Sequence, residues 1–245
     1  MLLVALAAAP SLFLLVFFYL KDRYEPEPRG HVALAFVKGA AAIVPSYLGA
    51  LALERVVGRE WLLLGGTAAR LFEAGVLAAG LEELSKWALF LVLIYRWSEF
   101  DEPLDGVVYG VAMALGFATV ENVLAVRRDG LQIGLLRAIF AVPAHALFGA
   151  VMGFYFGRAK LGHGRAAGRD VTPGQRRLRI ALALAVPLGF HAAYDFALLG
   201  LRGVWLYGVV GAGSVLLWAF VLRRVHRAQR DSPFRRTATH DIMER

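Results

Sequence analysis

The sequence predicts an all-α protein that crosses a membrane several times. Hydrophobic residues make up 58% of its 245 residues, and the mean hydropathy is +0.57. They fall in long apolar blocks that short charged segments separate. A bilayer core of ~30 Å needs about 20 apolar residues in a helix, and backbone groups in lipid need partners within the structure. Because no block alternates like a barrel strand, the blocks predict a transmembrane helical bundle.

Seven blocks are long enough to span the bilayer, and they cover residues 2–20, 32–54, 77–95, 104–126, 132–157, 179–200 and 203–222. An eighth span stays open, because the segment from Trp61 to Ala79 is also apolar. Arg70 and Glu73 favour an amphipathic helix at the membrane surface for that segment. The charged run Lys21 to Arg23 follows the first block in a stop-transfer arrangement, so we expect this block to remain as the first helix.

Lys and Arg are distributed unevenly between the two sides of this topology. With seven spans, 18 of the 27 basic residues lie on one side, in regions 21–30, 96–103, 158–179 and 223–245. The positive-inside rule predicts that this side is cytoplasmic, with the N-terminus outside and the C-terminus in the cytoplasm. The net charge of +8 then reflects topology and contact with anionic lipids of the bilayer. A nucleic-acid partner is not expected, since no module combines aromatic and basic residues.

Ionisable residues inside four of the blocks indicate a candidate active site, because charged groups at bilayer depth are costly and mark function by default. The ionisable residues are Glu82, Glu83, Lys86, Glu121, His145, His191 and Asp195, and Phe117 and Asn122 accompany Glu121 in its block. At ~1.5 Å per residue, the carboxylates of the third, fourth and sixth blocks share a layer ~7–14 Å below the surface opposite the basic loops. Residues four apart, such as Glu82 and Lys86, also share one helix face.

These segments resemble the PrsW family of bacterial intramembrane proteases, which is related to the CAAX prenyl endopeptidase and bacteriocin-processing (CPBP) superfamily. The matching pieces are 22–28 (DRYEPEP), 82–86 (EELSK), 117–122 (FATVEN), Pro143 with His145, and 191–195 (HAAYD). The resemblance implies a glutamate-dependent peptidase of the bacterial cell membrane. It also implies single-pass membrane proteins, with anti-sigma factors as the class, as substrates. Prenyl endopeptidases have histidine where Glu121 stands and asparagine where Asp195 stands, so their residue roles do not transfer unchanged.

In chemical terms, Glu82 is the predicted general base that takes a proton from water, and Glu121 helps to hold that water. Direct water attack is favoured because no Ser, Cys or Thr forms a convincing nucleophile–base pair. His191 is expected to donate to the oxyanion, while Asp195 holds the His191 tautomer or, when protonated, donates directly.

The remaining site residues have less sharply defined roles. Glu83 and Lys86 form a predicted supporting pair, because Glu83 is rotated by ~100° from Glu82 and can have different partners. His145 is expected to stabilise the oxyanion, orient Glu121 or assist the leaving amine. Phe117 and Asn122 are expected to support the site, Asn122 by packing.

Two other functions stay open. A metal-dependent protease is conceivable because the carboxylates and histidines can supply ligands, but no HExxH helix is present, so neither a metal nor another cofactor is expected. A proton-coupled transporter also uses buried carboxylates, yet it predicts repeated halves, and no internal repeat is visible. Residues 1–230 are therefore predicted to form a single intramembrane protease domain, and 231–245 a polar, disordered cytoplasmic tail.

Overall fold

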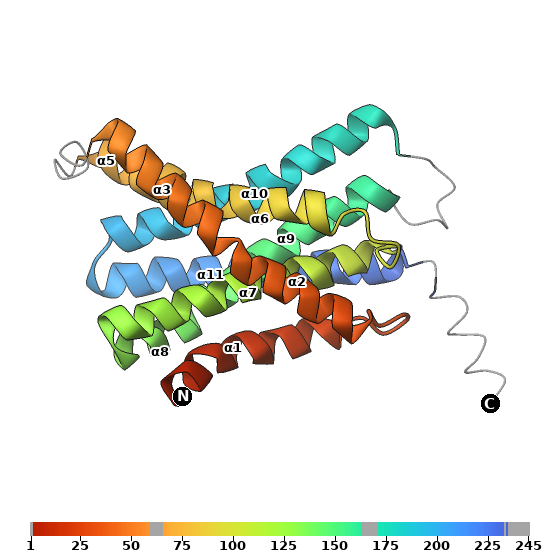
Figure 1. The fold of residues 1–245 in the computed structure, drawn as a ribbon, viewed down its shortest axis with the longest axis horizontal. Helices are drawn as coiled ribbons and strands as arrows, with labels where there is room; N and C mark the ends of the chain where they lie inside the picture. The colour runs from red at the N-terminus through yellow and green to blue at the C-terminus, as the bar shows by residue number, and fades with distance from the viewer. Residues whose placement is uncertain (1, 59–65, 163–170, 233, 235–245) are drawn as a thin grey trace.

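The computed structural model describes residues 2–58, 66–162, 171–232 and 234, and every element within these ranges is a helix. The elements are α1 (Leu2–Tyr19), α2 (Arg29–Ala41), α3 (Ile43–Val57), α5 (Thr67–Phe72), the π-helix η1 (Glu73–Ala78), α6 (Ala79–Leu93), α7 (Pro103–Asp129), α8 (Leu131–Ile139), α9 (Ala141–Leu161), α10 (Pro173–Gly200) and α11 (Gly203–Arg230). Figure 1 shows the chain returning repeatedly between the two ends of an elongated bundle.

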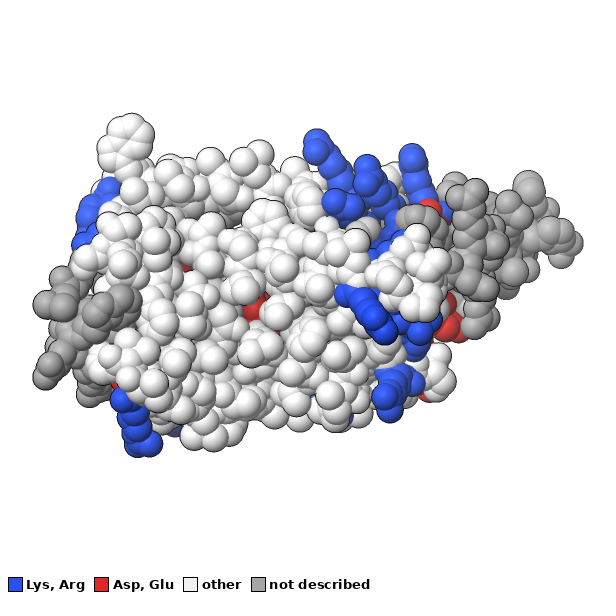
Figure 2. Space-filling model, turned by 90° about the horizontal axis from the view of Figure 1, so that it is seen from above, with Lys and Arg blue, Asp and Glu red and all other residues white. Residues whose placement is uncertain are grey.

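Five helical segments of the described chain are long and apolar enough to cross a membrane, which confirms a multi-pass helical protein. They are Arg29–Val57, Pro103–Asp129, Leu131–Leu161, Pro173–Gly200 and Gly203–Arg230. Val4–Tyr19 of α1 is a shorter apolar helix. On the face shown in Figure 2, Lys and Arg lie toward the two ends and are absent from the middle, where a few Asp or Glu atoms reach the surface. The count of seven or eight spans stays a prediction.

The segment predicted as a separate surface helix joins the third span instead. Residues 61–65 of that segment lie outside the described residues. From Thr67 onward, α5 and η1 lead directly into α6, since no proline or turn interrupts residues 67–93. A π-helix closes wider turns than an α-helix and often occurs at functional sites. Here η1 ends four residues before Glu82.

Two of the predicted spans are each divided into two helices by a proline. The span 32–54 breaks at Ala42 between α2 and α3, and the span 132–157 breaks at Phe140 between α8 and α9. Proline has no backbone N–H to bond the carbonyl four residues earlier. For Pro45 and Pro143, those carbonyls belong to the last residues of α2 and α8.

Helix α7 is the centre of the bundle because glycines let its backbone approach α9 on one side and α2 on the other. A Cβ atom on Gly110 would collide with the carbonyl of Gly149, and one on Gly153 with the carbonyl of Gly106. A Cβ atom on Gly39 of α2 would likewise collide with the Met113 carbonyl. Small residues permit such close packing of membrane helices. Gly149 and Gly153 thus form part of the close contact between α7 and α9.

The four basic regions meet at one end of the bundle, as the topology requires. The side chains of Gln229, Lys160 and Arg179 each donate a hydrogen bond of 2.6 Å to a backbone carbonyl, respectively of Lys21, Trp97 and Arg158. Arg158 also pairs with Asp231 at 2.6 Å. The relative sidedness of these loops is therefore confirmed. Which end faces the cytoplasm stays a prediction.

The predicted disordered tail lies mostly outside the described residues, which exclude 233 and 235–245. Its first residues pack on the bundle: Asp231 pairs with Arg158, and the Ser232 hydroxyl donates to the Glu102 carboxylate. The contacts of the bundle therefore extend past residue 230 to Asp231 and Ser232. The single-domain assignment stays a prediction.

The loop between α1 and α2 turns two carboxyl groups into the bundle. Asp22 and Glu27 are both buried. Burial, followed by the carboxylates of Glu102 and Glu27, raises the pKa of Asp22 to about 8. Burial likewise raises the pKa of Glu27 to about 7, although a hydrogen bond from Tyr109 opposes the shift. Buried polar groups therefore anchor this loop to the bundle.

Candidate active site

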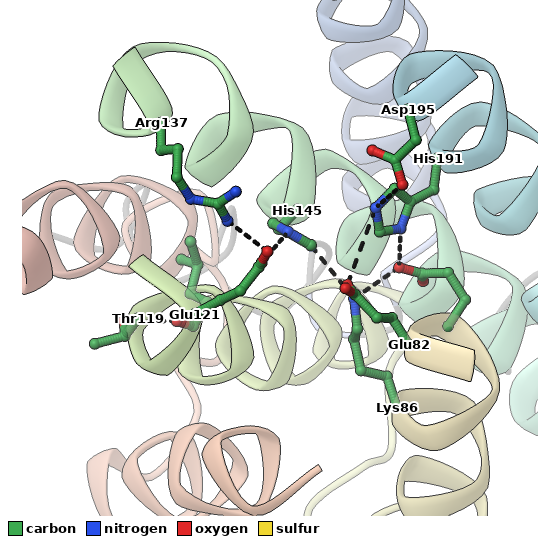
Figure 3. Close-up of polar contacts among 10 residues, drawn as sticks. Glu82, Lys86, Thr119, Glu121, Arg137, His145, His191 and Asp195 are labelled. Atoms are coloured by element: carbon green, nitrogen blue, oxygen red, sulfur yellow. Dashed lines mark hydrogen bonds and ion pairs between the residues drawn. The ribbon is translucent and has the colours of Figure 1, made fainter. Parts of the chain in front are cut away.

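The predicted site residues converge from four helices, and α8 adds a fifth. Glu82 and Lys86 come from α6, Glu121 from α7, His145 from α9, and His191 with Asp195 from α10. Figure 3 shows these side chains pointing toward one another, with Arg137 of α8 beside Glu121. The shared layer inferred from helix depth is therefore realised as direct contact.

The ammonium group of Lys86 lies at the centre of the cluster. Its Nζ is 2.7 Å from Glu83 Oε1, 3.3 Å from His145 Nδ1 and 3.7 Å from Glu82 Oε2. Lys86 is 1% exposed and Glu83 is 0% exposed, so this ion pair is fully inside the protein. The Phe117 ring also covers the Lys86 ammonium at 4.3 Å from its centroid. The predicted supporting pair of Glu83 and Lys86 is thus formed, with Phe117 as its neighbour.

Glu121 is held by two basic groups. His145 Nε2 lies 2.9 Å from Glu121 Oε2, and Arg137 Nη2 lies 2.6 Å from Glu121 Oε1. The two carboxylate oxygens therefore have separate partners from α9 and α8. Among the predicted roles of His145, this geometry favours orienting Glu121.

His191 uses its two ring nitrogens differently. Its Nδ1 is 2.9 Å from Glu83 Oε1, while its Nε2 is 3.4 Å from Asp195 Oδ2 and 4.0 Å from Glu82 Oε2. The shorter contact shows that Glu83 is better placed than Asp195 to fix the tautomer. The sequence suggested Asp195 because it lies four residues away, but the fold brings Glu83 closer. The Phe148 ring stacks on His191 at 4.8 Å and limits its rotation.

A cavity of about 550 Å³ opens onto this cluster. Its lining includes five of the six predicted catalytic residues, namely Glu82, Glu121, His145, His191 and Asp195. The side chains of Glu82, Glu121 and Asp195 are 16%, 27% and 19% exposed, whereas Glu83 is sealed behind them. Glu82 Oε2 has no hydrogen-bond partner among the described residues. The two adjacent carboxylates are therefore separated into a buried one and one that reaches the cavity.

Asn122 has a structural contact away from the cavity. Its Nδ2 donates to the carbonyl of Ala7 at 2.9 Å, which ties α7 to α1. This contact agrees with the predicted packing role. It fixes the helix that carries Glu121.

Arg137 is the site residue that sequence reasoning missed. It lies within the predicted apolar span 132–157. An arginine inside such a span carries the same signal as the buried glutamates, because it is costly without a partner. The break before α9 places Arg137 on a short helix of its own, next to Glu121.

The cluster contains a set of possible metal ligands. One ligand atom from each of Glu82, His145 and His191 lies within 4.8 Å of the others. Two imidazoles and a carboxylate are the donors of several catalytic zinc sites, so the residues fit such an ion. Lys86 stands against it, because its ammonium lies 3.3 Å from His145 Nδ1. An ion bound by these three residues therefore requires the Lys86 side chain to move.

Comparison with known proteins identifies the family to which this chain belongs. The family described as "PrsW family intramembrane metalloprotease" matches residues 27–223. The chain belongs to the PrsW family. "Protease PrsW" of Geobacillus kaustophilus is 36% identical over 93% of this chain and 92% of the relative, and that of Bacillus subtilis is 36% identical over 93% and 95%. "Protease PrsW" of Clostridioides difficile is 29% identical over 91% and 89%. No solved structure matches the chain.

Membership of the PrsW family confirms the resemblance drawn from the five motifs. Four of them, and the last two residues of the first, lie within residues 27–223. It makes the chain an intramembrane protease of a multi-pass membrane protein family. The transporter hypothesis is therefore not retained. The roles of individual site residues remain to be proposed.

The Lys86–Glu83 pair predicts a specific stability defect. Lys86→Met leaves Glu83 buried without its counter-charge, and breaking a buried ion pair costs about 3–5 kcal/mol. We expect a large fall in the unfolding temperature of the purified protein in detergent. The double variant Glu83→Gln/Lys86→Met should recover part of the loss, because no buried charge remains. An unchanged unfolding temperature for Lys86→Met would show that this pair does not hold the site together.

Proposed function

We propose that this PrsW-family protease cleaves a membrane-anchored protein with a water molecule that Glu82 activates. The observation that supports this assignment is the position of Glu82. Its carboxylate borders the cavity, while its buried Oε2 makes no hydrogen bond and lies 3.7 Å from Lys86 Nζ and 4.0 Å from His191 Nε2. Glu121, in contrast, has both oxygens in contact with basic groups, which leaves Glu82 as the better base.

The reaction follows from these contacts. Glu82 takes a proton from water as the water oxygen attacks the scissile carbonyl carbon. An imidazolium at His191 donates from Nδ1 to Glu83 and presents Nε2–H to the carbonyl oxygen that gains negative charge. When the C–N bond breaks, Glu82 returns its proton to the leaving amine. Glu121, oriented by Arg137 and His145, holds the water beside Glu82.

The proposed substrate is a single-pass membrane protein, of the anti-sigma-factor class that the family resemblance implies. The proposed topology places the basic end of the bundle in the cytoplasm of a bacterial cell. Glu121 lies eight residues before the opposite end of α7, at Asp129, which is ~12 Å along a helix. The cavity therefore belongs to the extracytoplasmic half of the membrane in this topology.

The assignment of the base predicts a loss of turnover with folding preserved. Glu82→Gln keeps the shape of the side chain but removes the proton acceptor, so cleavage should fall by ~10²–10⁴-fold. The measurement is cleavage of single-pass membrane proteins by purified protein in detergent. Glu99→Gln, which changes a partly exposed carboxylate at the other end of the bundle, is the matched control. Near-normal turnover by a folded Glu82→Gln protein rules out the assignment.

The depth of the site predicts where the substrate is cut. A helix hides its carbonyls in hydrogen bonds, so attack should occur where the substrate helix frays near its outer end. We expect cleavage in the outer juxtamembrane segment or first outer turns, with a membrane-bound stub remaining. Mass spectrometry of the fragments measures the new terminus. A terminus in the cytoplasmic half of the substrate span contradicts the proposed topology or mechanism.

Metal-dependent hydrolysis is a second candidate, which the donor set of Glu82, His145 and His191 and the family description favour. A zinc ion bound there would supply a Lewis acid that lowers the pKa of its water. Glu121 and Arg137 would then orient His145 from the side away from the cluster centre.

Treatment with a strong chelator separates the two candidates. If Glu82 activates water without a metal, prolonged chelation should leave the cleavage rate within about twofold of the untreated enzyme, and elemental analysis should find no stoichiometric zinc. Glu99→Gln treated in parallel reports any general effect of the chelator. Loss of cleavage that tracks loss of metal, with recovery on adding zinc, would establish the second candidate instead.

A further inference from the structure

A second cluster of carboxyl groups lies at the basic end of the bundle. Asp22 and Glu27 come from the loop between α1 and α2, Glu102 precedes α7, and Asp105 lies in its first turn. All four are buried, Asp22 and Glu27 to 3% exposure. One oxygen from each of Asp22, Glu27 and Asp105 lies within 4.8 Å of the others. Two chain segments distant from the candidate active site, the α1–α2 loop and the start of α7, are thus joined by acidic groups.

This cluster is separate from the candidate active site. Asp105 and Glu121 lie on the same helix, α7, sixteen residues apart. At 1.5 Å per residue they are ~24 Å apart along the helix axis. An ion bound near Asp105 therefore cannot contact the residues that we propose for water activation.

The hydrogen bonds of the cluster leave several oxygens without a partner. Tyr109 donates to Glu27, and Ser232 donates to Glu102. Asp105 Oδ2 accepts from the backbone N–H groups of Asp101 at 2.9 Å and Glu102 at 2.7 Å. Within the described residues, both oxygens of Asp22, Oδ1 of Asp105 and Oε1 of Glu102 have no hydrogen-bond partner.

The basic groups nearby are engaged elsewhere. Lys160 is close enough for Asp105 and Glu27 to influence it, but its ammonium donates to the carbonyl of Trp97 at 2.6 Å. Arg158 pairs with Asp231. Buried carboxylates are normally paired with a basic group or coordinate a metal. Asp22 is 3% exposed and has no basic partner within the described chain, and one of its oxygens lies close to oxygens of Glu27 and Asp105.

We propose that Asp22, Glu27 and Asp105 bind a divalent cation, with Ca²⁺ favoured, and that Glu102 supports the site. Hard cations prefer oxygen ligands such as these carboxylates. Ca²⁺ accepts several carboxylate oxygens in a flexible geometry, whereas Mg²⁺ demands a near-ideal octahedron and usually keeps several waters. Three carboxyl groups from separate parts of the chain therefore suit Ca²⁺ better. The ion links the α1–α2 loop to the start of α7, and Ser232 extends this link through Glu102 to the end of α11.

Cation-dependent stability tests this proposal without using proteolysis. The full chain in detergent is treated with a chelator, and its unfolding temperature is measured during titration with Ca²⁺ or with Mg²⁺. We expect an increase with Ca²⁺ that is larger than with Mg²⁺ at the same concentration, because an ion that binds only the folded state stabilises it. Terbium(III), a luminescent probe for calcium sites, should give emission sensitised by Tyr109, whose hydroxyl contacts Glu27, and Ca²⁺ should displace it.

Substitutions identify the ligands. Asp22→Asn and Asp105→Asn should lose the Ca²⁺-dependent shift and the terbium signal, whereas Glu25→Gln, an exposed carboxylate of the same loop, should keep both. Glu82→Gln should also keep both, which separates this ion from any metal at the candidate active site. If the Asn variants do not fold, the response of the unsubstituted protein still decides. The proposal is overturned if neither ion shifts the unfolding temperature, if Asp22→Asn leaves the shift intact, or if Mg²⁺ acts more strongly than Ca²⁺.

Discussion

The buried ion pair between Lys86 and Glu83 is the interaction on which the candidate site depends. A charge inside an apolar bundle is tolerated only with a partner at hydrogen-bond distance, and these two groups are 2.7 Å apart. Because Lys86 neutralises Glu83, Glu83 can fix His191, and the adjacent Glu82 is left facing the cavity. The adjacent residues Glu82 and Glu83 thus have different environments. They point in different directions from the helix, and the closer contact of Lys86 with Glu83 keeps Glu83 buried while Glu82 borders the cavity.

The close helix packing determines whether the remaining groups can reach this pair. Glycines bring the backbones of α7 and α9 together, so that Glu121 and His145 meet at 2.9 Å across the interface. Side chains on packed helices are positioned more accurately than side chains on loops. The exception is Arg137, which lies on the short helix α8. A movement of α8 would release one oxygen of Glu121 while His145 keeps the other.

The sequence predicted which residues gather and the Glu83–Lys86 pair, but not the partner of His191. Helix depth placed Glu82, Glu121, His191 and Asp195 in one layer, because depth follows from position in the sequence alone. The partner of His191 could not be predicted, since four-residue spacing pointed to Asp195 while Glu83 approaches from another helix. The helix breaks depended on Pro45 and Pro143, which a search for apolar blocks ignores. Arg137 could not be assigned to the site from the sequence, because its position beside Glu121 depends on the helix break that follows α8.

The two acidic clusters of this chain show how a buried carboxylate can be satisfied in two ways. In the candidate active site, the protein supplies positive charge through Lys86 and Arg137, and two imidazoles add polar contacts to Glu121 and Glu83. At the other end, the described chain supplies hydroxyl and backbone donors but no ion pair, although basic residues are concentrated there. Those basic side chains contact carbonyls and Asp231 instead. Asp22 and Asp105 therefore lack a basic partner within the described chain, and a small cation from solution can bind between their carboxyl groups where no long basic side chain pairs with them.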